Sequence, residues 1–265
     1  MFGELTMAAA AAASIPWSDA IFALLVVLLG YVVLGLSGFG SALVIVPLLT
    51  WRWPLTLVVP LILLIDLPAF LLHTGLNLRK VAWREIPRLV PTMLAGALLG
   101  VCLLANASSN WPLLVLGLYI AVVGLRGLRS AGRAAPVHPR WAWPAGLLMG
   151  LVESMFGTAG PVVVAWLSRR LPDPTILRAT LPMAIVIVVA LAIGGSAVGG
   201  QMRQALLWTA WPVLQPVALV GVVLGHRIAG RVPAEQMRRV VFGLLVFSGV
   251  AMVGRGVSAT LGGVG

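Results

Sequence analysis

Charged side chains are scarce in this chain. Only 9% of the 265 residues are charged, whereas 60% are hydrophobic. Soluble domains carry about 25% charged residues, because a surface that faces water must be largely polar. The composition therefore excludes an ordinary soluble domain and indicates a protein whose main solvent is the lipid bilayer.

Acidic residues are scarcer still, with 7 Asp and Glu against 18 Lys and Arg, for a net charge of +11. In a soluble protein this excess would suggest a nucleic-acid partner. Here the basic residues lie between apolar segments, where they set the orientation of a membrane protein. We therefore expect contact with lipid and no nucleic acid.

The residues of most metal and catalytic sites are also rare. The single cysteine, Cys102, excludes an intrachain disulfide and a cysteine metal cluster, and the three histidines are widely separated. The chain has no Gly-Lys-Ser/Thr phosphate loop, and its Gly-Leu-Ser-Gly-Phe lacks the spacing of a nucleophile elbow. We expect no catalytic residue, metal or cofactor, and hence no enzyme.

What the chain does have is long apolar runs. A helix that crosses a bilayer needs about 20 apolar residues. Eight nearly uncharged segments approach this length: 21–49, 55–76, 89–109, 111–125, 142–167, 179–201, 206–225 and 240–254. The predicted fold is an all-α integral membrane protein.

Two of these segments are interrupted by small residues. Segment 21–49 would be about 43 Å long as one helix, more than the hydrocarbon core of about 30 Å. Its middle, residues 35–41, holds three glycines and two serines, which disfavour a continuous helix. Segment 142–167 contains a similar stretch at 153–161. Each segment is predicted to be a broken helix or a re-entrant hairpin.

Residue matches indicate an internal duplication. Phe39-Gly40-Ser41-Ala42 parallels Phe156-Gly157-Thr158-Ala159. A second set of matches has one constant offset without a gap: Trp83, Pro87, Pro91, Gly96 and Gly100 parallel Trp208, Pro212, Pro216, Gly221 and Gly225. The predicted organisation is an N-terminal tail (1–20), repeat 1 (21–130), a cytoplasmic linker (131–141), repeat 2 (142–257) and a C-terminal tail (258–265). Secondary transporters are commonly built in this way.

The charge distribution predicts the topology. If all eight segments cross the membrane, Lys and Arg divide almost evenly between the two sides. If 142–167 is re-entrant, they divide 15 to 3, as the positive-inside rule favours. If 21–49 is also re-entrant, each repeat has three full spans. The repeats are then inverted, and both termini lie outside.

The two breaks are the candidate binding site. Unpaired backbone groups at membrane depth survive only inside the protein or beside a cavity. The N-terminus of a half-helix presents N–H groups and a positive dipole to an anion. The alternative is close packing of helices through small residues. The candidate residues are Ser37, Gly38, Phe39, Gly40, Ser41, Ser154, Phe156, Gly157, Thr158 and Gly160.

Asp66 and Glu153 are the acidic residues within the apolar segments. A carboxyl group at membrane depth is costly, so each is a candidate for carrying a coupling proton. The alternative for each is a structural carboxyl group that is protonated or hydrogen-bonded.

The stretches GLSGFGSALVIVPLL at 35–49 and GLLMGLVESMFGTAGP at 146–161, together with the eight segments, resemble the TauE/SafE family of anion permeases. The resemblance covers nearly the whole chain. It implies a multi-pass inner-membrane transporter, here expected to export sulfite or another sulfur-containing anion, with a homo-oligomer left open. The alternatives are a membrane-embedded enzyme acting on a lipid or isoprenoid, and a non-transporting partner of a membrane complex.

Overall fold

The computed structural model describes residues 16–74, 78–107, 111–129, 137–229 and, within 242–254, all but 244, 245 and 248. The regular structure of these residues is entirely helical. The helices are α2 (Trp17–Ser37), α3 (Ser41–Leu49), α4 (Leu55–Thr74), α5 (Ile86–Ala105), α6 (Trp111–Arg129), α7 (Ala142–Phe156), α8 (Gly160–Arg170), α9 (Pro174–Val198) and α10 (Ala205–Ala229). Three 3₁₀ turns join them: η1 (Leu78–Lys80), η2 (Pro139–Trp141) and η3 (Gln201–Arg203). Residues 1–15 of the predicted N-terminal tail, the predicted C-terminal tail and most of the predicted linker lie outside the described residues. Residues 17–20, which were predicted to belong to the tail, form the start of α2.

Five of the helices are long and apolar enough to cross a membrane: α2, α4, α5, α9 and α10. With 20 to 25 residues each, they are about 30–38 Å long, which matches the hydrocarbon core. Helix α6 is apolar over a shorter stretch. The predicted all-helical membrane fold is confirmed at this level.

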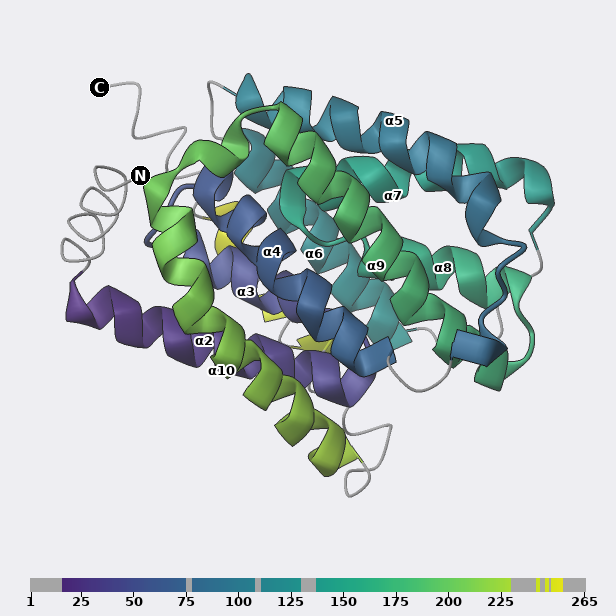
Figure 1. Ribbon diagram of the computed structural model, residues 1–265, viewed down its shortest axis with the longest axis horizontal. Coiled ribbons are helices and arrows are strands. Elements are labelled where there is room, and N and C mark those ends of the chain that lie inside the picture. Colours follow the sequence, from purple (N-terminus) through teal and green to yellow (C-terminus); the bar gives the residue numbers. More distant parts are fainter. Residues whose placement is uncertain are drawn as a thin grey trace.

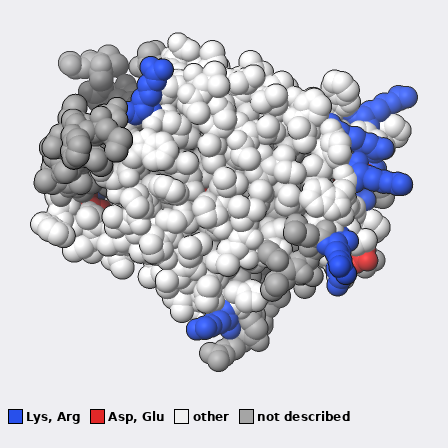
Figure 2. All heavy atoms as spheres, in the orientation of Figure 1, with Lys and Arg blue, Asp and Glu red and all other residues white. Residues whose placement is uncertain are grey.

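One end of the helix bundle is basic. Arg170, at the end of α8, pairs with Glu85 at 2.7 Å and donates to the carbonyl of Val137 at 3.2 Å. The N–H of Ala82 donates to Thr180 Oγ1 at 2.9 Å. These contacts bring the starts of α5, α7 and α9 and the end of α8 together. Figure 2 shows most of the Lys and Arg side chains of that view at one end of the molecule. We call this the basic end.

The opposite end holds the starts of α2, α4 and α10. Gln204, just before α10, donates to the carbonyl of Thr56 in the first turn of α4 at 3.0 Å. Arg52, just after α3, pairs with Asp19 in the first turn of α2 at 2.9 Å. Helices α4 and α10 therefore run from this end towards the basic end.

The two interrupted segments form hairpins that open at different ends. The Arg52–Asp19 pair joins the two ends of the α2–α3 hairpin at the opposite end. The Arg170–Val137 hydrogen bond joins the two ends of the α7–α8 hairpin at the basic end. Each hairpin therefore enters and leaves the bundle on one side, and the two hairpins point towards each other.

Glycines allow the long arms of the hairpins to pack closely on the spanning helices. A Cβ atom at Gly150 of α7 would overlap the carbonyl of Met93 on α5, and one at Gly225 of α10 would overlap the carbonyl of Val32 on α2. Figure 1 shows α2 beside α10 and α5 beside α7. Small residues permit such backbone contact in membranes. At these positions packing is the correct interpretation of the small residues.

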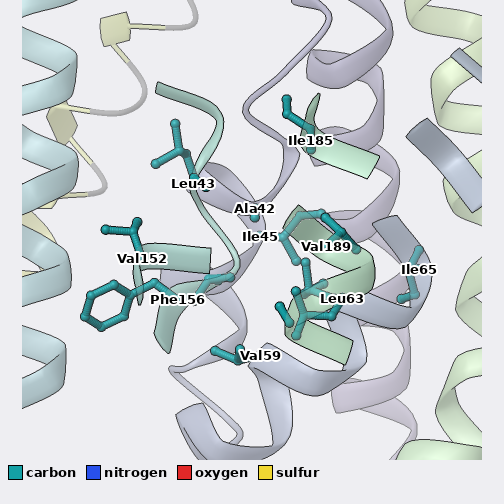
Figure 3. Packing of buried hydrophobic residues seen from close by; sticks show 14 of the residues in the cluster. Ala42, Leu43, Ile45, Val59, Leu63, Ile65, Val152, Phe156, Ile185 and Val189 are labelled. Carbon is teal, nitrogen blue, oxygen red and sulfur yellow. The ribbon is translucent and has the colours of Figure 1, made fainter. Parts of the chain in front are cut away.

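The core lies around the short half-helices. Figure 3 shows buried hydrophobic side chains from α3, α4, α7 and α9 gathered around the start of α3, where Ala42 lies. The outer faces of the long helices remain apolar and exposed, as at Leu25 on α2 and Leu118 on α6. In a membrane these outer faces contact lipid, whereas the short half-helix α3 and the two breaks lie inside the protein.

Candidate functional site

The tips of the two hairpins line one small pocket. Its walls are Gly40, Ser41, Ala42 and Leu43 from the first break, Gly157, Thr158, Gly160 and Pro161 from the second, and Asp66, Phe70, Glu153 and Ile185 from α4, α7 and α9. The breaks also approach each other at Phe39, which does not line the pocket: a Cβ atom on Gly160 would lie 3.4 Å from Cβ of Phe39. Segments more than 100 positions apart in the sequence thus form a single site.

The first break follows from two glycines. Gly38 ends α2 with φ 80°, and its N–H donates to the carbonyl of Leu34 at 2.7 Å. Gly40 precedes α3 with φ 95° and provides no side-chain cap. Residues with a Cβ atom rarely adopt such positive φ values. The first N–H groups of α3, which no helix carbonyl can accept, are therefore presented at the pocket wall.

The second break has a similar construction. Gly157 ends α7 with φ 65°, and its N–H donates to the carbonyl of Glu153 at 2.6 Å. Helix α8 begins at Gly160 with Pro161 in its first turn, a position where the missing N–H has no helical partner in any case. The N-termini of both half-helices, with their partial positive charge, therefore face the same pocket.

Asp66 connects three helices at this site. It is 1% exposed. Its Oδ1 accepts hydrogen bonds from the hydroxyl of Tyr31 at 2.8 Å and from Ser41 Oγ at 3.0 Å. Since Tyr31 lies on α2 and Ser41 begins α3, the carboxyl group of α4 fixes the first hairpin in place.

Glu153 has the corresponding role at the second break. It is 2% exposed, and its Oε2 accepts the backbone N–H of Ala159 at 2.7 Å. The hydroxyl of Tyr119 on α6 donates to the carbonyl of Thr158 at 3.0 Å. Each predicted carboxyl group is thus bonded to one break.

Two hydroxyl groups at the second break have no hydrogen-bond partner among the described residues. They are Ser154 Oγ and Thr158 Oγ1, and both side chains are buried. Thr158 lines the pocket, whereas Ser154 lies against Gly100 of α5. A buried hydroxyl without a partner carries a free-energy cost, so the Thr158 hydroxyl is available to a ligand.

The structure divides the predicted site residues into two groups. Gly40, Ser41, Gly157, Thr158 and Gly160 line the pocket, and Asp66 and Glu153 join them. Ser37, Gly38, Phe39, Ser154 and Phe156 form or support the breaks without lining it. Ser37, for example, donates to the carbonyls of Val33 and Phe39, and Phe156 is part of the core.

Sequence reasoning did not identify Tyr31 and Tyr119. They are the two tyrosines of the whole chain, and both donate to residues of the pocket wall. The available signal was their position: each places a phenol group in the middle of an apolar segment, where a buried hydroxyl needs a partner.

The pocket wall combines apolar residues with two hydroxyl and two carboxyl side chains, and it contains no cation. No Lys, Arg or His is among its lining residues. Over the described part of the chain, no cluster of three or more His, Cys, Asp or Glu could hold a metal ion. A ligand in this pocket would meet backbone N–H groups, hydroxyl groups and two carboxyl groups.

Apolar helices of membrane-spanning length around a pocket that two broken helices and two buried carboxyl groups line are typical of membrane transporters. The comparisons with known proteins agree. The chain belongs to the sulfite exporter TauE/SafE family, whose sequence profile matches residues 22–252.

Two relatives are informative. The chain is 44% identical over 193 residues to the "Probable inner membrane transporter protein TsaS" of Comamonas testosteroni, covering 72% of this chain and 81% of that protein. It is 27% identical over 236 residues to the "Probable sulfite/organosulfonate exporter TauE" of Cupriavidus necator, covering 87% and 88%. No solved structure matches the chain.

Family membership confirms the resemblance drawn from the two Gly-rich stretches. It also decides against the alternative of a lipid- or isoprenoid-modifying enzyme. The chain is a membrane transporter, and it resides in the inner membrane.

Proposed function

We propose that the protein is a secondary transporter that exports sulfite or a related organosulfonate across the inner membrane. The observation that carries the proposal is the shared pocket, where two half-helix N-termini and the unpartnered Thr158 hydroxyl meet. These groups can hold an oxyanion without a fixed positive charge. The family description and the name of the Cupriavidus necator relative supply the sulfur chemistry and the direction.

The neutral character of the donors suits turnover. A buried arginine would hold an anion strongly, because the low dielectric of the interior strengthens the attraction between opposite charges. Backbone N–H groups and hydroxyls hold it less strongly and release it more readily. A transporter must do both in every cycle.

The proposed mechanism is alternating access between two inverted repeats, residues 21–130 and 142–257, with the joining segment 131–141 in the cytoplasm and both termini outside. Three observations support it. The hairpins open at different ends. Helix α5 of repeat 1 packs on α7 of repeat 2 through Gly96 and Gly100. Helix α10 of repeat 2 packs on α2 of repeat 1 through the matching Gly221 and Gly225. Movement of one repeat against the other would open the pocket to each side in turn.

Asp66 and Glu153 are the proposed proton carriers. Two carboxyl groups in one pocket without a cation are costly to keep charged together, and a negatively charged substrate adds to that cost. Binding of a proton to the site would favour the anion. Transport is therefore proposed to be coupled to protons.

Flux measurements in proteoliposomes test the function. The purified protein should release entrapped sulfite or methanesulfonate faster than empty liposomes. Gly40→Val and Gly157→Val should abolish this flux, because β-branched residues do not tolerate the positive φ at the breaks.

Gly200→Val is the matched control. Gly200 has a positive φ of 76°, but it precedes η3 and does not line the pocket. It should impose similar backbone strain and preserve most of the transport per folded molecule. Equal losses in all three variants, or no flux from the unmodified protein, would refute the proposed site. A non-transporting partner protein would show no flux at all.

A further inference from the structure

At each break, a carboxyl group of the protein already occupies a donor that suits an anion. The Glu153 carboxyl accepts the Ala159 N–H at the start of α8. The Asp66 carboxyl accepts the Ser41 hydroxyl at the start of α3. All four residues except Ala159, which directly precedes Gly160, line the shared pocket.

We propose that the Glu153 carboxylate competes with the substrate anion for the N-terminus of α8. The carboxylate occupies this terminus until a proton neutralises it. This inference rests on the proposed function, since it names the group that gates the same site. It goes further, because it says that Glu153 occupies the anion-binding position as well as carrying a proton.

The geometry of the α8 N-terminus supports competition between the Glu153 carboxylate and the substrate anion for one binding position. The Glu153 Oε2–Ala159 N distance of 2.7 Å is at the short end of the range for a hydrogen bond from a backbone N–H, so the carboxyl group fully occupies this donor. Pro161 removes one N–H from this terminus, and the N–H groups of Val162 and Val163 both donate to the carbonyl of Ala159. The Ala159 N–H is therefore one of the few donors at this terminus, and an anion and the Glu153 carboxylate compete for it.

The unpartnered Thr158 hydroxyl is independent evidence for an external ligand. It lies on the pocket wall next to Ala159, and Thr158 is 3% exposed. The Glu153 carboxyl bonds to Ala159 but not to this hydroxyl. A tetrahedral or pyramidal oxyanion has several acceptor oxygens, so it can accept from both donors where the carboxyl satisfies one.

The surroundings of Glu153 contain few other titratable groups. Asp66 faces it from α4, and two tyrosines lie nearby, Tyr31 on α2 and Tyr119 on α6. Helices α5 and α9 also pack on α7, and they carry no Asp, Glu, Lys, Arg or His over 89–105 and 179–198. The basic residues of α8 are at its far end, at Arg169 and Arg170. No cation compensates for the Glu153 charge within the pocket.

The sign of the coupling follows. When Glu153 is charged, its carboxylate occupies the anion-binding position and repels a second negative charge. When a proton neutralises Glu153, the hydrogen bond from the Ala159 N–H to its carboxyl group weakens, and the anion replaces that group. One proton is thus taken up with each anion that binds, so the affinity for the anion falls as pH rises.

The test is a binding titration of the purified full-length protein with methanesulfonate, whose single charge is constant from acidic to alkaline pH. The unmodified protein should bind more weakly at alkaline pH. Glu153→Gln keeps a neutral oxygen that can accept from Ala159, so its affinity should fall less with rising pH than that of the unmodified protein, the remaining dependence being that of Asp66. Glu153→Ala leaves the Ala159 N–H without an acceptor. It should bind methanesulfonate roughly tenfold or more tightly than Glu153→Gln, since the anion gains a charge-assisted hydrogen bond from this N–H.

Asp19→Asn is the control, because it removes a carboxyl group at the opposite end of the bundle. It should bind methanesulfonate with the pH dependence of the unmodified protein. If Glu153→Ala does not fold, Glu153→Leu, which also offers the Ala159 N–H no acceptor oxygen, replaces it in the comparison with Glu153→Gln.

Several outcomes would overturn the inference. Binding by the unmodified protein that does not change with pH would do so. Equal affinities of Glu153→Ala and Glu153→Gln would show that Glu153 carries a proton but does not compete with the anion for its binding position. Absence of binding in every protein would refute the proposed function itself, and with it this inference.

Discussion

Replacement of Thr158 by valine should separate stability from function. The two side chains have nearly the same shape, and the substitution removes one hydroxyl group. That hydroxyl has no partner among the described residues and the side chain is 3% exposed. A buried unpaired polar group costs about 1–3 kcal/mol. Thr158→Val should therefore leave the free energy of unfolding unchanged or raise it.

The same substitution should weaken anion binding. A hydrogen bond from a neutral donor to a charged group contributes about 1.5–3 kcal/mol, which corresponds to roughly a 10- to 150-fold change in affinity. Methanesulfonate binding and sulfite efflux from proteoliposomes measure the loss, and thermal unfolding in detergent measures the stability. Thr158→Ser, which keeps a hydroxyl, should retain most of the affinity.

Ser196 offers the matched control. Its hydroxyl is also unpartnered and fully buried, but it does not line the pocket. Ser196→Ala should leave transport unchanged. The reasoning would be refuted if Thr158→Val bound the anion as tightly as the unmodified protein, or if Ser196→Ala lost transport to the same extent.

Three further predictions follow from packing, hydrogen bonding and topology. Gly150→Ala should lower the free energy of unfolding by about 1–3 kcal/mol or more, because its Cβ would overlap the Met93 carbonyl. Gly194→Ala, with open space around it, should not lower the free energy of unfolding. Equal thermal stability of both variants would contradict the packing. Tyr31→Phe should lower stability by about 1.5–3 kcal/mol, because Asp66 loses one of its two donors, and an unchanged melting temperature would remove Tyr31 from the network. A reporter fused after Gly265 that is active only in the cytoplasm should be silent, since the 15-to-3 charge distribution and the inverted repeats place the C-terminus outside; activity would contradict that topology.

Much of the site was predictable because its elements are local in sequence. Gly38 and Gly157 interrupt apolar segments, and glycine is the residue that ends a helix with a positive φ. Asp66 and Glu153 stand out because carboxyl groups are rare at membrane depth. These signals depend on neighbouring residues alone.

Small residues carry more than one meaning, and the sequence did not separate them. Gly40 and Gly157 shape the pocket, while Gly150 and Gly225 bring helices into contact. Ser41 bonds to a carboxyl group, whereas Ser37 bonds to the backbone of its own helix end. The residue type is the same, and the neighbours that distinguish the roles come from other helices.

The sequence by itself determined the solvent, the helical class and the places where two helices break, because these follow from composition and from the conformational range of single residues. Only the tertiary structure decided that both breaks share one pocket, that Tyr31 and Tyr119 donate to its wall, and that Thr158 has a free hydroxyl. The physical reason is distance along the chain. Hydrogen bonds and burial between residues 35 and 39 positions apart, or more than 100 apart, leave no periodic pattern in a sequence. They are set by how the apolar helices pack once lipid has covered their outer faces.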